Sequence, residues 1–101
     1  MSGGEEALFR YARYYGAAYG QPVEIVKKRG APAWLPADER RRNDFVVYFR
    51  RRGAPRKESL MTGHGPSFED ACRMVLDFYM VEREDGASDE EMEMRYAAAG
   101  V

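Results

Sequence analysis

One cysteine and one histidine are the residues of this chain that best suit nucleophilic catalysis. Cys72 and His64 are each the sole residue of their type. A cysteine nucleophile also needs a third group that orients its base and a cleft that holds the substrate, and nothing in the sequence signals either. The chain has neither a phosphate-binding P-loop nor a dinucleotide-binding glycine motif. We therefore expect a protein that is not an enzyme and uses no cofactor.

Carboxylates, the other groups that could do chemistry, concentrate near the C-terminus. They are Glu82, Glu84, Asp85, Asp89, Glu90, Glu91 and Glu93. Their spacing lacks the Asp-x-Asp-x-Asp-Gly register of a calcium loop, and one cysteine can build neither a cysteine-based zinc cage nor an internal disulfide. We expect no metal site. Two interpretations stay open: a solvated face, or an electrostatic surface that binds a basic partner.

Basic residues cluster in the first half of the chain. The candidate phosphate-contacting residues are Arg40, Arg41, Arg42, Arg50, Arg51, Arg52, Arg56 and Lys57. Such residues bind nucleic acid through a few phosphate contacts with a strong salt dependence, or they form a solvated rim.

The net charge of -1 conceals a strong asymmetry along the chain. Residues 1–57 hold 13 basic and 6 acidic residues, and residues 58–101 hold 3 and 11, so the halves carry +7 and -8. Fields of this size steer association with charged partners. Alternatively, the halves neutralise each other within one molecule, or across the contact of a homodimer.

Two aromatic residues are candidate anchors for a protein partner. Tyr14 lies off the helix face formed by Tyr11, Tyr15 and Tyr19, beside arginines, a combination enriched at binding hot spots. Trp34, between two prolines, either plugs the sheet or anchors a partner from an exposed loop.

The elements that must position these residues begin with a helix over residues 5–19, which has a regular apolar face. Residues 22–29 predict a strand, and residues 30–44 a long loop with two prolines. Alternating apolar residues over 44–51 predict the clearest strand, which a turn at 53–56 ends.

The second half of the chain predicts one more strand and two helices. Residues 57–62 form the strand, which Gly63 to Pro66 should break. Ser67 caps a helix over residues 68–83, and Ser88 caps a short acidic helix. Together these elements predict a single α+β domain over residues 1–101. It has α-β-β-β-α order, a three-stranded antiparallel sheet with the helices on one face, a core over about 5–82 and an acidic C-terminal appendage over about 83–101.

This order of elements resembles the double-stranded-RNA-binding domain. The local likeness lies in residues 45–79, where the stretch that begins at Phe45 is similar to the family's second strand. Gly63, Gly65 and Ser67 are similar to its Gly-x-Gly-x-Ser helix entry. The resemblance implies contact with RNA through the loop of Arg40–Arg42 and the hairpin arginines. The family's basic cluster after the serine is missing, because Glu69 and Asp70 stand there and repel phosphates from the helix N-terminus.

The expected function is therefore that of a small binding protein. It would inhibit or modulate a nucleic-acid-handling complex by placing its acidic segment, with Tyr14 and Trp34, on a basic surface of a protein partner. In type it looks like phage or mobile-element inhibitors such as anti-CRISPR proteins. The alternative is an RNA- or DNA-binding module that uses the basic loops. No stretch is long and apolar enough to span a membrane and the first residues lack signal-peptide features, so we expect a cytoplasmic protein, with a homodimer as a further possibility.

Overall fold

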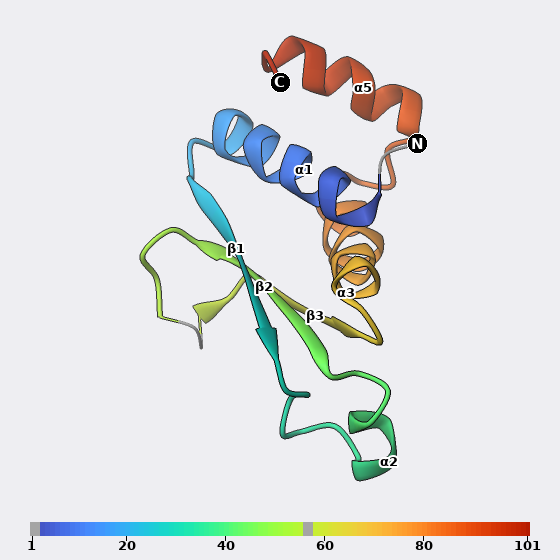
Figure 1. Ribbon diagram of the computed structural model, residues 1–101. Coiled ribbons are helices and arrows are strands. Elements are labelled where there is room, and N and C mark those ends of the chain that lie inside the picture. The colour runs from blue at the N-terminus through green and yellow to red at the C-terminus, as the bar shows by residue number, and fades with distance from the viewer. Residues whose placement is uncertain (1–2, 56–57) are drawn as a thin grey trace.

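The computed structural model describes residues 3–55 and 58–101 of the chain (Figure 1). Its elements are α1 (Gly4–Tyr19), β1 (Val23–Arg29), α2 (Ala37–Arg40), β2 (Phe45–Arg51), β3 (Met61–Gly65), α3 (Phe68–Val75), the π-helical segment η2 (Leu76–Met80), α4 (Val81–Arg83) and α5 (Asp89–Ala98). The predicted site residues Arg56 and Lys57 lie outside the described residues.

The three strands form one antiparallel sheet in the order β1-β2-β3. Tyr48, at the middle of β2, pairs with Val26 of β1 and with Thr62 of β3. The predicted α+β class, with its antiparallel sheet and C-terminal helix, is thereby confirmed.

The bounds of the third strand differ from the prediction. We expected residues 57–62 with a break at Gly63, but β3 runs from Met61 to Gly65. The glycines serve as points of close contact, because a side-chain carbon added at Gly63 would lie 2.2 Å from the backbone oxygen of Ala71 in α3. They let the helix pack directly on the strand.

The hydrophobic core lies between the sheet and the two long helices. Val47 and Phe49 of β2 are fully buried, as are Leu8 and Tyr11 of α1 and Val75 of α3. The opposite face, which carries Val46 and His64, meets the loop that leads into α2. Helical segments therefore lie on both sides of the sheet, with α1 and α3 together on the core side.

The predicted helix over residues 68–83 is present as α3, η2 and α4 in succession. Ser67 caps it as expected, because its hydroxyl accepts a hydrogen bond of 3.1 Å from the Asp70 N–H. The π-helical segment, in which hydrogen bonds span one residue more than in an α-helix, interrupts the regular winding.

The core extends beyond its expected limit at residue 82. Met92 and Tyr96 of α5 are 4% and 7% exposed and belong to the same cluster as the sheet residues. Helix α5 lies against α1 on the side away from the sheet (Figure 1), where Tyr96 and Tyr14 form an edge-on ring pair. The acidic C-terminal segment is thus integrated into the fold by packing.

Candidate binding surfaces

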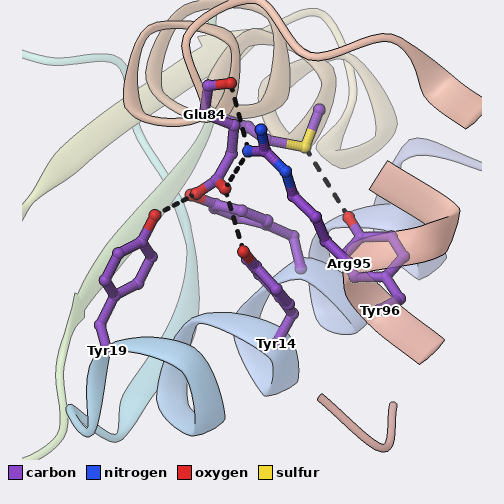
Figure 2. Close-up of polar contacts among 7 residues, drawn as sticks. Tyr14, Tyr19, Glu84, Arg95 and Tyr96 are labelled. Carbon is purple, nitrogen blue, oxygen red and sulfur yellow. Dashed lines mark hydrogen bonds and ion pairs between the residues drawn. The ribbon is translucent and has the colours of Figure 1, made fainter. Parts of the chain in front are cut away.

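A buried carboxylate, Glu84, joins α1, the end of α4 and α5 (Figure 2). Its side chain accepts hydrogen bonds of 3.1 Å from Tyr11, 3.1 Å from Tyr14 and 2.7 Å from Tyr19, all on α1. Arg95 of α5 donates a fourth bond of 3.0 Å and also lies 3.3 Å from the Glu84 backbone oxygen. We call this group, Tyr11, Tyr14, Tyr19, Glu84 and Arg95, the Glu84 clasp.

The clasp keeps the Glu84 carboxylate charged in an apolar setting. Burial by itself raises the pKa of this carboxyl, but the hydrogen bonds from the three tyrosines and Arg95 outweigh burial and hold the pKa below its ordinary value. Burial also raises the pKa of Tyr11 and Tyr19, and the adjacent charge of Glu84 adds to this rise. The tyrosines therefore remain donors and the carboxylate remains an acceptor.

The prediction that Tyr14 and Glu84 contact a partner at the surface is consequently wrong. Tyr14 is 7% and Glu84 2% exposed, so neither is available to a partner. The expectation that Tyr14 lies off the face of Tyr11 and Tyr19 is also wrong, because all three hydroxyls reach the same carboxylate. Their spacing along α1 is compatible with a shared buried acceptor, although it does not identify Glu84.

The remaining predicted carboxylates form an exposed acidic end of the molecule. It consists of Glu82, Asp85, Asp89, Glu90, Glu91 and Glu93, from α4, the turn after it and α5. Glu93 is bound by Arg10 at 2.6 Å. In the part of the chain that the structure describes, the other five carboxylates have no ion-pair partner.

The first arginine cluster lies at the other end of the molecule, around α2 (Figure 1). Arg40, Arg41 and Arg42 are exposed and form no ion pair with any described residue. The side-chain oxygen of Asn43, which follows them, lies 3.0 Å from Nδ1 of His64. The Trp34 ring packs edge-on against the His64 ring, with 5.5 Å between the ring centroids. We call Trp34, Arg40, Arg41, Arg42 and His64 the basic end.

Trp34 is an exposed residue and does not plug the sheet. It is 69% exposed even though its edge touches His64. Leu35, the next residue, is 6% exposed and takes the buried position in this loop.

The second arginine cluster lies away from the first. Arg50 and Arg51 belong to the far end of β2, about 20 Å along the strand from the basic end. Arg50 pairs with Glu24 at 2.8 Å and Arg51 with Glu58 at 3.8 Å. Arg52 follows in the turn and is exposed. The structure therefore does not join the two clusters into one continuous basic surface.

Cys72 and His64 are separated by the sheet. Cys72 is fully buried in the core, and burial raises the pKa of its thiol to about 11. Since Gly63 faces α3, the adjacent His64 points to the opposite face, toward Trp34 and Asn43. The two side chains thus do not form a nucleophile–base pair.

Comparisons with known proteins give no match for this chain. No family model matches it, and no curated protein and no solved structure is significantly similar to it. Over residues 3–55 and 58–101, no group of three or more acidic, histidine or cysteine side chains is arranged to hold a metal ion. No helix of these residues has the length and hydropathy needed to cross a membrane.

Proposed function

We propose that this protein is a cytoplasmic, non-enzymatic binding protein whose acidic end docks on a basic surface of a nucleic-acid-handling protein. The observation that carries the proposal is the set of five exposed carboxylates without a cation partner among the described residues. A groove that binds phosphates has the complementary charge. A protein that occupies it would compete with nucleic acid and inhibit the complex.

The Glu84 clasp fixes the position of the acidic end, which favours a binding role over that of a merely solvated surface. The Glu84 clasp ties the turn before α5 to α1, so the carboxylates are held in one arrangement before a partner arrives. Such preorganisation lowers the entropic cost of binding.

Exposed apolar side chains lie beside these carboxylates. Phe78 is 63% exposed and Met94 69% exposed. Phe78 lines a hollow of about 500 Å³ together with Glu82 and Asp85. A combination of carboxylates and large apolar side chains suits a protein surface, where aromatic and methionine residues are enriched at contact centres.

Charge reversal tests this proposal. The wild-type protein, the pair Glu90→Lys with Glu91→Lys, and the control pair Asp38→Lys with Glu39→Lys are added to purified RNA-guided and other nucleases whose DNA binding is measured. The control makes the same change of charge in α2, at the opposite end. We expect the wild type and the control to displace DNA from at least one nuclease and the α5 pair to lose this activity. Displacement that survives reversal in α5, or is absent with the wild type, would show the proposal to be wrong.

A second candidate function, nucleic-acid binding, rests on the basic end. An exposed tryptophan offers a stacking surface for a base, and the three nearby arginines, which have no ion-pair partner among the described residues, offer cations for phosphates. The resemblance to double-stranded-RNA-binding domains supports the same class of ligand.

Fluorescence anisotropy with labelled double-stranded RNA, single-stranded RNA and duplex DNA at about 50 mM and 200 mM salt tests this candidate. We expect Arg41→Glu to weaken binding and flatten its salt dependence. Arg83→Glu, which makes the same change of charge at an exposed site on α4, is the control. Absence of binding at both salt concentrations would show this second candidate to be wrong.

Self-association is a third arrangement that the same charges support. The molecule is 43 Å long, and its two ends carry opposite charges that have no ion-pair partner within residues 3–55 and 58–101. Head-to-tail contact would raise the mass measured by light scattering at low salt, and a monomer mass there would oppose it.

A further inference from the structure

Strand β1 is an edge strand whose outer side is open. Two backbone bonds fix its orientation: the Gly30 N–H donates to Asp44 at 2.7 Å, and the Arg52 N–H donates to Pro22 at 3.0 Å. Gly30 and Pro22 therefore turn their backbone groups toward the β2 side. Since this direction alternates along an antiparallel strand, the odd-numbered residues of β1 turn theirs outward. These residues are Val23, Ile25, Lys27 and Arg29, and their backbone groups have no backbone partner in the described chain.

A groove of about 600 Å³ runs beside this open edge, between β1 and α1. Its apolar lining includes Phe9, Ala12 and Gly16 of α1 and Val23 and Ile25 of β1. Phe9 is 43% exposed although it lies on the helix that covers the core. Gly16 leaves room there, because the nearest atom to an added side-chain carbon would be 3.8 Å away.

The charges around the edge are positive. Arg13 and Arg52 line the groove, and Lys28 lies on the opposite face of β1. None of the three has an ion-pair partner among residues 3–55 and 58–101. Glu24, the carboxylate of this strand, is already paired with Arg50 at 2.8 Å. The complementary ligand is therefore an anion.

A second copy of the chain fits this edge poorly. If two β1 strands paired antiparallel about Val26, Arg29 of the second copy would lie opposite Val23, in the groove that Arg13 and Arg52 line. Like charges in such proximity are destabilising. The occupant favoured by charge belongs to another protein.

We infer that the β1 edge binds an extended acidic segment of a partner protein as a fourth strand of the sheet. The segment's backbone pairs with the outward groups of Val23, Ile25, Lys27 and Arg29. One of its apolar side chains fills the groove beside Gly16, and its carboxylates lie near Arg13, Lys28 and Arg52. This mode is strand addition, in which backbone bonds provide affinity and the pocket and charges provide specificity. It does not depend on the acidic end and stands apart from the proposed function.

A synthetic peptide tests the inference without knowledge of the partner. The probe has the length of β1, 7 residues, and carries a fluorescent label. A central leucine can fill the groove, and glutamates on both faces of the strand can reach Arg13, Lys28 and Arg52. Its control replaces each glutamate by lysine. We expect the acidic peptide to bind the full chain at least about tenfold more tightly than the basic one. Equal affinities, or no binding of the acidic peptide, would overturn the inference.

Backbone pairing and groove filling have separate readouts. Amide hydrogen exchange should slow at Ile25 and Lys27 when the acidic peptide is added, whereas the Val26 amide, already directed at β2, should change little. Gly16→Leu, which fills the groove and favours the helix, and Arg13→Glu should each weaken peptide binding by about tenfold. Asp77→Lys, at an exposed site on η2, is the control. Binding that leaves the exchange of Ile25 and Lys27 unchanged would refute strand addition even if the peptide binds elsewhere.

Discussion

Arg95 Nη1 lies 3.0 Å from Glu84 Oε1, in an ion pair whose two side chains differ greatly in exposure: Glu84 is 2% and Arg95 38% exposed. The carboxylate is thus the buried member, and α5 is held to the rest of the fold partly through a cation that still reaches solvent. Because Glu84 also accepts bonds from three tyrosines of α1, one side chain connects the two ends of the chain.

Removal of the Glu84 carboxylate should therefore destabilise the protein strongly. Glu84→Ala leaves three tyrosine hydroxyls without their acceptor, and we expect a loss of about 3 kcal/mol in the free energy of unfolding. Urea unfolding followed by circular dichroism measures this loss. Glu93→Gln, which breaks an exposed pair with Arg10, should lower the free energy of unfolding far less than Glu84→Ala. Equal effects of the two variants would contradict the structural role of Glu84.

Acid should weaken the fold through the same group. The pKa of Glu84 is lowered in the folded protein from an ordinary value of 4.5, so its contribution to stability is complete above that value and is lost as the pH falls through the folded pKa. We expect the melting temperature to drop below about pH 4.5, and to drop less in Glu84→Gln, which has no carboxyl to protonate. If the melting temperatures of the two proteins fell in parallel with pH, the acid sensitivity would come from other carboxylates.

Two glycines should respond in opposite ways to substitution by alanine. At Gly63 the new carbon would lie 2.2 Å from the Ala71 backbone oxygen, so β3 and α3 must move apart, at a cost of about 1–3 kcal/mol. At Gly16 there is space, and Gly16→Ala should stabilise α1 by up to about 1 kcal/mol. Thermal unfolding of both variants checks this contrast. A neutral Gly63→Ala would mean that α3 does not approach β3 this closely.

Trp34 should contribute little to stability despite its size. Because it is 69% exposed, we expect Trp34→Ala to change the free energy of unfolding by no more than about 0.5 kcal/mol. Leu35→Ala, at the adjacent buried position, should cost at least about 2 kcal/mol. Trp34 is the one tryptophan of the chain, so acrylamide quenching of its fluorescence reports its exposure directly. Weak quenching would show that the ring is covered.

Cys72 should be inert in the folded protein. Its side chain is fully buried and its pKa is raised to about 11, so little thiolate forms near neutral pH. Reaction with a chromogenic thiol reagent should be slow under native conditions and fast in denaturant. Rapid native labelling would mean that α3 opens readily.

Local features of the sequence determined most of the secondary structure. Ser67 and Ser88 cap their helices as their positions indicate, since each hydroxyl accepts a bond from the N–H three residues later. The strand β2 and the end of α1 at the left-handed Gly20 could likewise be predicted from the sequence, because apolar alternation and a glycine stop act within a few residues. The end of β3 was misplaced, because the tolerance of a strand for glycines depends on the helix that packs against it.

The candidate binding surfaces depended on contacts between residues far apart in the chain. Glu84 and Tyr11 are separated by 73 positions, so the sequence alone grouped Glu84 with its exposed acidic neighbours and Tyr14 with the exposed arginines. Only the tertiary structure distinguished the buried carboxylate from the five exposed ones, which have no ion-pair partner in the described part of the chain. The physical reason is that the burial and pairing of a charged group are set by the neighbours the fold supplies, whereas helix caps and strand alternation are set by the adjacent chain.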